Sequence, residues 1–148
     1  MGVFLRDACI DDALLILNWR NDFETRQNSF NKNIIDYNDH LAWYQKKLED
    51  NNCFMFILVD NTECVGHIRI DKFNNVGKIS YMIAPKKRKM GYGKLIIELI
   101  DNIIPSEISI LVGFVDRNNI PSRKCFITNN YSELIEDNII CYIKSSIN

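Results

Sequence analysis

The chain has 148 residues, 47% of them hydrophobic and 25% charged, which is the composition of an ordinary globular protein with a single domain over 1–148. Lys and Arg number 18 against 19 Asp and Glu, so there is no overall basic excess of the kind that favours nucleic acid or acidic membranes. Any anion-binding site must therefore be local.

The N-terminus and the cysteines indicate the compartment. Residues 1–7 carry charges where a signal peptide needs an apolar core, and no apolar run approaches membrane-spanning length. The five cysteines are odd in number, widely spaced, and form no CxxC pair of the kind that zinc sites use. We therefore expect a cytoplasmic protein with reduced thiols, no metal, and neither a membrane nor a nucleic acid as partner.

The first half of the chain predicts a strand, two helices and a hairpin. Asp11 and Asp12 precede an apolar run as helix caps do, and the segment before residue 50 has helical periodicity with a charged outer face. A continuous apolar run then stops at Asp60 and resumes with alternating character, which is typical of a hairpin. The expected elements are a strand over 3–7, a helix through Trp19, a loop over 21–33, a helix over 36–49 and strands over 54–59 and 65–71.

The second half predicts strands and helices in alternation. A strand ends before Pro85, which lacks the N–H that a central strand needs, and Pro105 ends a helical rhythm of apolar residues. A last pair of strands turns at Asp137 and Asn138. The expected elements are strands over 78–84 and 108–112, helices over 93–104 and 120–129, and the terminal hairpin over 131–143.

The segment that joins the strand over 78–84 to the next helix has the chemistry of an anion site. Glycines let the backbone approach a phosphate, the first amides of a helix have no internal partners, and flanking Arg and Lys add charge. Neither a Walker A loop nor a GxGxxG dinucleotide loop is present. The segment consists of Arg88, Lys89, Met90, Gly91, Tyr92, Gly93 and Lys94.

This loop resembles the acetyl-CoA loop of the GNAT (GCN5-related N-acetyltransferase) superfamily, whose pattern Q/R-x-x-G-x-G/A is filled here by Arg88, Gly91 and Gly93. A second family element, N-x-x-S/A-x-x-L-Y/F-x-x-x-G-F, follows in the correct order. It is matched by Asn119, Ser122, Cys125, Phe126, Asn130 and Tyr131. Asn130 replaces a glycine, which is a mild change because Asn is the next best residue in a left-handed conformation.

The resemblance implies an α/β fold with a mixed, mostly antiparallel sheet of about seven strands and four flanking helices, splayed between the fourth and fifth strands. It also implies acetyl-CoA as cofactor, CoA as product, and no metal. The loop amides would hold the pyrophosphate, and the preceding strand end would pair with the pantetheine arm. Beyond the loop, the implied cofactor-binding residues are Met82, Ile83, Ala84, Asn119, Ser122 and Phe126.

For catalysis, the resemblance places a backbone amide, that of Ile83, at the thioester carbonyl. Phe126 stands where many members have a tyrosine that protonates the CoA sulfur, so either Tyr131 or Ser122 replaces it or the thiolate leaves unassisted. Lys78 stands where some members have a glutamate base. His67 is then a candidate proton relay, against the alternative of a strand histidine without a chemical role. Without a strong base, an α-amine or a sugar amine is easier to acetylate than lysine.

The acceptor side is expected in the first half of the chain. Arg20 and Arg26 suit a phosphate or carboxylate, and Trp19 or Trp43 suits stacking on a base or sugar; the alternative is a purely structural role for all four. The segments W-R-N-D…R and H-x-x-W, which include Asn21 and His40, look like two GNAT branches. One acetylates UDP-linked 4-amino sugars and the other ribosomal-protein N-termini.

These observations predict an N-acetyltransferase that acts on a small-molecule amine. The acceptor of choice is a nucleotide-linked amino sugar, with His40 as a substrate or base residue. The alternatives are a protein N-terminal acetyltransferase and a non-catalytic acyl-CoA-binding module. A homodimer stays open.

Overall fold

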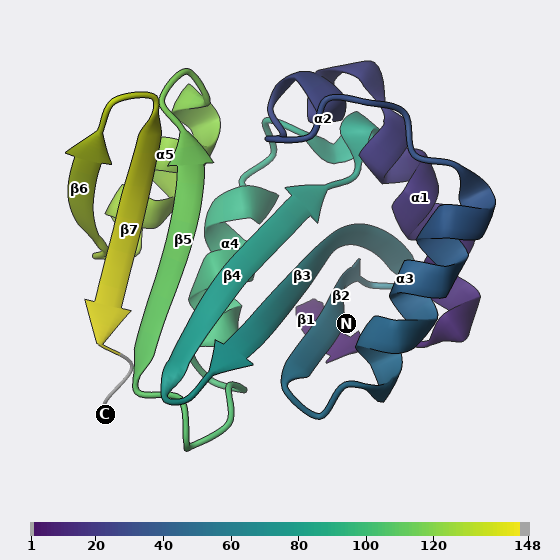
Figure 1. Ribbon diagram of the computed structural model, residues 1–148, viewed down its shortest axis with the longest axis horizontal. Helices are drawn as coiled ribbons and strands as arrows, with labels where there is room; N and C mark the ends of the chain where they lie inside the picture. Colours follow the sequence, from purple (N-terminus) through teal and green to yellow (C-terminus); the bar gives the residue numbers. More distant parts are fainter. Residues whose placement is uncertain (1, 146–148) are drawn as a thin grey trace.

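The computed structural model describes residues 2–145, which form one seven-stranded sheet with helices on both faces (Figure 1). The strands are β1 (Val3–Asp7), β2 (Cys53–Asp60), β3 (Glu63–Phe73), β4 (Val76–Ile83), β5 (Ile110–Asp116), β6 (Ser132–Glu136) and β7 (Ile139–Ser145). Their spatial order is β1-β2-β3-β4-β5-β7-β6, and neighbours are antiparallel except for the parallel pair β4–β5. This confirms the predicted mixed, mostly antiparallel sheet.

Two hydrophobic clusters hold the helices to the two faces of the sheet. One packs Ile96, Ile97 and Ile100 against strand residues such as Ile68, and the other packs Ile16 and Tyr44 against Met55 and Ile57. The helices are α1 (Ala13–Asn21), α2 (Phe23–Gln27), α3 (Tyr37–Glu49), α4 (Tyr92–Ile100) and α5 (Ile120–Thr128), with short 3-10 turns η1 (Ile10–Asp12) and η2 (Pro85–Lys87). In Figure 1, α1 and α3 cover one face of the β2–β4 half, while α4 and α5 lie behind the sheet. Over the described residues, no helix is both long and apolar enough to traverse a membrane.

The structure differs from the sequence prediction by an additional helix, by an earlier end of α4, and by β5, which runs over Ile110–Asp116 and not over 108–112. The segment predicted as a loop over 21–33 contains α2, because the Asp22 carboxylate accepts a hydrogen bond of 3.2 Å from the Thr25 N–H and so caps a short helix. Helix α4 ends at Ile100, four residues before the predicted end. Beyond it, Asp101 N–H donates to the Glu98 carbonyl and Asn102 N–H to the Leu99 carbonyl, so tighter turns replace the last helical turn.

The sheet opens between β4 and β5, as predicted. Their parallel pairing covers Val76–Ile79 against 110–113 and goes no further, although β4 continues to Ile83. The last four residues of β4 therefore pair with β3 on one side and lack a strand on the other. This opening positions the site.

Candidate functional site

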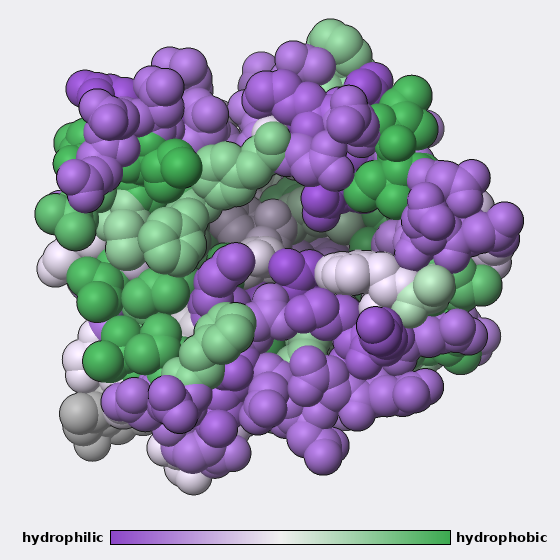
Figure 2. All heavy atoms as spheres, in the orientation of Figure 1, coloured by the Kyte–Doolittle hydropathy of each residue, from purple (hydrophilic) through white to green (hydrophobic). Residues whose placement is uncertain are grey.

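A cavity of about 900 Å³ lies at the opening between β4 and β5. Figure 2 shows this face of the molecule hollowed near its centre. The walls come from the end of β4, the loop before α4, the first turn of α5, and the helices α1 to α3. The cavity therefore touches both the segment expected to bind the cofactor and the segment expected to bind the acceptor.

The backbone of Ile83 faces this opening. Ala84 N–H donates to the Val65 carbonyl at 2.8 Å, and Ile83 pairs with Gly66, so these two residues form a non-hydrogen-bonded antiparallel pair. In such a pair, each residue directs its own N–H and C=O away from the partner strand. The amide of Ile83 is thus directed to the side where β5 has separated, where it can bind an extended ligand as a neighbouring strand would.

The loop before α4 presents further backbone donors. Lys89 and Gly91 have φ of 62° and 86°, so the chain turns sharply in the left-handed region before the helix begins. The first amide of α4 with a partner in its own helix is that of Leu95, which donates to the Gly91 carbonyl. The three preceding amides lack such a partner. Of the expected loop residues, those that line the cavity are Arg88, Lys89, Gly91, Tyr92, Gly93 and Lys94, whereas Met90 points to solvent and is 60% exposed.

Helices α4 and α5 approach each other closely beside the cavity. A Cβ at Gly93 would lie 2.8 Å from Cys125 Sγ, so glycine is required there for this contact. Asn119 caps α5 by accepting a hydrogen bond from the Ser122 N–H at 3.3 Å. Asn119 and Ser122 both line the cavity, as expected for cofactor-binding residues.

Tyr81 is a cavity residue that the sequence analysis did not identify. Its hydroxyl donates a 2.8 Å hydrogen bond to Ser122 Oγ, and burial raises the pKa of this phenol, so it stays protonated. It lies on β4 two residues before Ile83 and lines the same cavity. The period-2 alternation of the strand was the available signal, since it places residues 81 and 83 on one face.

Phe126 and Tyr131 lie in the core and not at the cavity. The Phe126 ring stacks on Tyr142 at 5.0 Å and meets Tyr131 edge-on at 5.1 Å. A Cβ at Gly113 would come within 2.4 Å of the Phe126 ring, so this ring packs directly against the β5 backbone. The Tyr131 hydroxyl is buried and finds no hydrogen-bond partner among residues 2–145. The expected roles of Phe126 in cofactor binding and of Tyr131 as proton donor therefore have no counterpart in this arrangement.

The two histidines line the cavity from different elements. His67, on β3, is buried, and its Nε2 has no hydrogen-bond partner in the part of the chain that the structure describes; burial, with the nearby Arg69 charge, lowers its pKa to about 3. His40, on α3, is held by a 2.8 Å hydrogen bond between Nε2 and the Ala13 carbonyl, and burial lowers its pKa as well. Both rings are therefore neutral near pH 7.

The acceptor wall carries a cation without a partner. Arg20 lines the cavity and, within residues 2–145, makes neither a hydrogen bond nor an ion pair; burial and the nearby Arg69 charge lower its pKa. Arg69 differs, because its Nε binds Asp71 at 2.8 Å while its guanidinium lies 5.0 Å from the centre of the Trp43 ring. The acidic residues that line the cavity are Glu24, Asp36 and Asp39, all exposed.

Four other expected residues do not line the cavity. Trp19 is 7% exposed and belongs to the core, so it cannot stack on a ligand. Asn21 holds the chain together locally by donating to the Ile35 carbonyl at 2.9 Å, and Arg26 donates to the Asn21 carbonyl at 3.2 Å. Ala84 is buried beside the strand end. Of the expected acceptor residues, Arg20 and Trp43 remain at the cavity.

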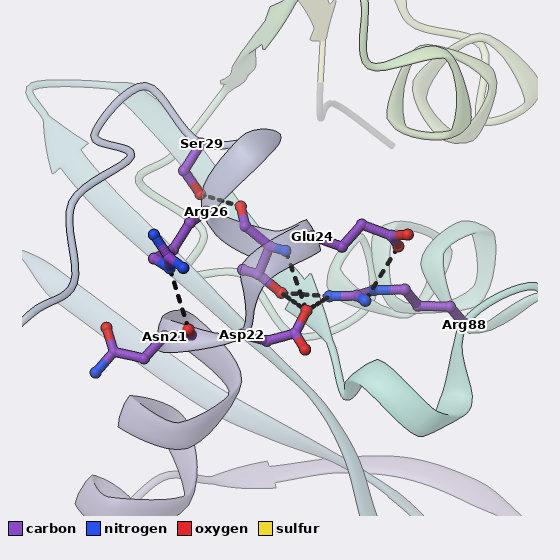
Figure 3. A network of polar contacts seen from close by, with 7 residues as sticks. Asn21, Asp22, Glu24, Arg26, Ser29 and Arg88 are labelled. Atoms are coloured by element: carbon purple, nitrogen blue, oxygen red, sulfur yellow. Dashed lines mark hydrogen bonds and ion pairs between the residues drawn. The ribbon is translucent and has the colours of Figure 1, made fainter.

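Arg88 is already paired with acidic residues, as Figure 3 shows. Its guanidinium binds the Asp22 carboxylate at 2.9 Å, the Glu24 carboxylate at 3.0 Å and the Thr25 hydroxyl. Two carboxylates therefore compete with an anion for the charge of Arg88, which was expected to belong to the cofactor loop. Lys89 and Lys94 remain as the cations of the loop. Within the described part of the chain, no group of three or more His, Cys, Asp or Glu residues could hold a metal ion.

Comparisons with known proteins agree with this geometry. Residues 3–129 match the family described as acetyltransferase (GNAT) domain. No curated protein sequence matches the chain. Among solved structures, the chain is similar to the spermidine N-acetyltransferase from Vibrio cholerae in complex with CoA and spermine, with 14% identity, coverage of 98% of this chain and 96% of that chain, and a TM-score of 0.86.

Two further structures share the fold. The aminoglycoside acetyltransferase AAC(6')-Ib, solved with coenzyme A, is 13% identical, with coverage of 97% and 95% and a TM-score of 0.83. YncA from Salmonella typhimurium, solved with acetyl-CoA, is 15% identical, with coverage of 100% and 96% and a TM-score of 0.79. At these identities, the likeness establishes the fold but not the acceptor.

Proposed function

Because the chain belongs to the acetyltransferase (GNAT) domain family, we propose that it transfers an acetyl group from acetyl-CoA to the amino group of a nucleotide-linked amino sugar. The observation that carries this proposal is the opening beside β4, where the backbone of Ile83 and the amides before α4 face one cavity with the unpaired Arg20. The backbone groups favour acetyl-CoA as the donor, and Arg20 favours an acceptor that carries an anion.

The donor side suits a diphosphate and an extended arm. Unpartnered amides at the start of α4, with Lys89 and Lys94 beside them, favour phosphate oxygens, since the helix N-terminus adds partial positive charge. Even a Cβ at Gly91 would have no neighbouring atom within 4 Å, so a ligand can approach the backbone closely there. Three similar structures contain CoA or acetyl-CoA.

The groups around the strand end suit acyl transfer. Acetyl-CoA supplies an activated thioester. The Ile83 N–H can donate a hydrogen bond to the thioester carbonyl oxygen, where negative charge develops as the amine attacks. The Tyr81 hydroxyl, on the same face of β4, can turn its single O–H from Ser122 Oγ to the departing sulfur, a role that Phe126 cannot fill. Because its pKa is raised, Tyr81 acts as a hydrogen-bond donor to the thiolate and retains its proton.

The cavity lacks a strong base, which restricts the acceptor amine. His67 has a pKa of about 3, so it accepts a hydrogen bond from the amine more readily than a proton. Deprotonating a lysine-like amine of pKa 10.4 at pH 7 costs about 4.6 kcal/mol, against about 1 kcal/mol for an amine of pKa near 7.7. An amine next to electron-withdrawing ring oxygens is therefore favoured over an alkyl amine.

Arg20 favours an acceptor that carries an anion. The half-buried Arg20 guanidinium has no carboxylate partner in the described part of the chain, which costs folding free energy unless a ligand supplies a negative charge. A phosphate is a suitable ligand, because Arg binds phosphate in a bidentate manner. The spermidine and aminoglycoside substrates of the similar enzymes are cationic, and Arg20 would repel an ammonium group placed beside it, so such substrates would have to lie at Glu24, Asp36 and Asp39. Trp43, on the same wall, offers a ring for stacking on a base or sugar.

A thiol-release assay with acetyl-CoA tests the proposal. The acceptors are a UDP-4-amino sugar, the same amino sugar without the nucleotide, N-terminal peptides, spermidine and kanamycin. We expect the highest kcat/KM with the nucleotide-linked sugar and about a tenfold or larger loss when the diphosphate is absent. Faster turnover of the peptides or of the cationic amines would reject the amino sugar as the acceptor. If CoA binds but none of the acceptors releases thiol, the protein is not an acetyltransferase for these amines.

A further inference from the structure

Arg88 joins two segments that lie 66 residues apart in the chain. It follows η2 in the cofactor loop, whereas its partners Asp22, Glu24 and Thr25 belong to α2 and its cap (Figure 3). We infer that Arg88 is a positioning residue that fixes the acceptor-side wall of the cavity to the cofactor loop. This inference rests on the proposed function for the identity of the two sides.

The wall formed by residues 22–35 has few other polar anchors. Within residues 2–145, its hydrogen bonds and ion pairs connect it to itself and to residues 19–21, apart from those to Arg88. None of the five residues of α2 is buried, and Phe23 is 67% exposed. A segment without buried side chains is held weakly by packing, so a long-range contact has a large share in fixing it.

The same segment forms one wall of the cavity. The residues of this wall that line the cavity are Glu24, Thr25, Asn28, Ser29, Asn31, Ile34 and Ile35. They face the cavity together with His40 and Trp43 of α3. The position of α2 therefore sets the shape of the acceptor side.

The residue type at position 88 suits this role. A guanidinium has donors in a rigid fork and can hold two carboxylates and a hydroxyl at once, which a lysine ammonium cannot do in the same geometry. Without Arg88, the Asp22 and Glu24 carboxylates would lose the cation that ties them to the cofactor loop. Two carboxylates already offset the charge of this guanidinium, so we assign the diphosphate to the loop amides and not to Arg88.

The test compares the donor and acceptor sides in Arg88→Gln. We expect a CoA dissociation constant within about twofold of the wild type, an acceptor KM raised about tenfold, and a kcat changed by less than about threefold. Amide hydrogen exchange should become faster over residues 22–35 and stay unchanged over 92–100. Asp22→Asn should give the same pattern, because Asn still caps α2 but loses the charge.

Controls separate this role from a general loss of structure. Arg123→Gln removes an arginine whose ion pair with Glu133 lies outside the cavity, and it should change neither KM nor exchange over 22–35. In the Arg88→Gln/Asp22→Asn double variant, the effects on KM should not add, because one interaction is lost in both.

Two results would overturn the inference. A tenfold loss of CoA affinity in Arg88→Gln with unchanged acceptor KM would make Arg88 a ligand of the donor. Unchanged exchange over residues 22–35 would show that the contact does not hold the wall. The exchange and CoA measurements need no acceptor, so they decide the role of Arg88 even where the proposed amino sugar is not turned over.

Discussion

The hydroxyl of Tyr81 donates to Ser122 Oγ at 2.8 Å, and this bond joins the open end of β4 to the first turn of α5. One residue comes from the strand that would hold the thioester and the other from the helix whose family motif supplies the usual proton donor. Their contact places a phenol at the cavity although position 126 holds phenylalanine. In the proposed reaction, this phenol would donate to the sulfur once its O–H turns away from Ser122 Oγ.

Replacing this phenol should slow the reaction without weakening the donor complex. We expect Tyr81→Phe to lower kcat by about 10-fold to 100-fold, since a hydrogen bond to a charged group contributes about 1.5–3 kcal/mol. The CoA dissociation constant should stay near that of the wild type. Tyr142→Phe is a matched control, because it removes a hydroxyl that binds Glu133 outside the cavity. Equal kcat in the two variants would remove Tyr81 from the mechanism.

Substitution of either loop glycine should destabilise the protein, for a different reason at each position. Gly93→Ala places a methyl group 2.8 Å from Cys125 Sγ, and we expect a loss of about 1–3 kcal/mol in the free energy of unfolding. Gly91→Ala meets no neighbour but forces a side chain onto a φ of 86°, at a cost of about 1–2 kcal/mol. Urea unfolding measures both losses. Adding Cys125→Ala should relieve the first loss and not the second, and equal relief in both would contradict the assignment.

Acidification should destabilise the protein through His67 before it acts on the carboxylates. The pKa of His67 is lowered to about 3 in the folded protein from 6.5, so the unfolded chain binds the extra proton between these values. The stabilisation is complete above pH 6.5 and is lost as the pH falls below it, by about 2 kcal/mol from pH 7.5 to pH 5. The lowered pKa values of Asp12 and Asp71 act below this window.

The measurement is the free energy of unfolding in urea at several pH values from 4.5 to 7.5 for the wild type and His67→Gln. The variant should show a shallower decline, whatever its absolute stability. His40 has a pKa lowered in the same direction and accounts for part of the remaining slope. If the free energy of unfolding falls with pH equally in both proteins, the pKa of His67 in the folded state is not lowered.

Arg20 should lower the free energy of unfolding while it strengthens acceptor binding. We expect Arg20→Met to raise the free energy of unfolding by roughly 0.5–1 kcal/mol, because it removes a half-buried charge without a partner, while the KM for the nucleotide-linked sugar rises at least about tenfold. Arg6→Met provides the contrast, since Arg6 binds Asp12 at 2.8 Å and its removal leaves the buried carboxylate with the Cys9 N–H but without a cation. Denaturation and steady-state kinetics test both variants. A less stable Arg20→Met would show that the guanidinium is satisfied within the fold.

The sequence was sufficient for features that depend on local chemistry. The helices that follow the loop glycines and Asn119 are encoded within a few residues: α5 begins at Ile120 as predicted, and α4 begins at Tyr92, one residue before the predicted start. Asn130 has the left-handed conformation, with φ of 69°, that its place in the family motif requires. The splay of β4 from β5 followed from the resemblance alone.

Features that depend on distant partners were missed. Helix α2 owes its position to Arg88, and the role of Tyr81 depends on Ser122, 41 residues away. The motif spacing places Phe126 on α5 but does not say which face of the helix packs against Gly113. Trp19 and Trp43 look alike in sequence, and only the packing of α1 and α3 separates the core residue from the cavity residue.

The backbone character of the donor side has a consequence for how such a protein can diverge. Every residue except proline carries an amide N–H, so most substitutions along 82–84 and 89–94 leave those donors in place. The acceptor side instead depends on the side chains of residues such as Arg20 and Trp43, where single replacements change charge and shape. A lineage can therefore exchange one amine for another by drift in the helices α1 to α3 while its thioester chemistry persists.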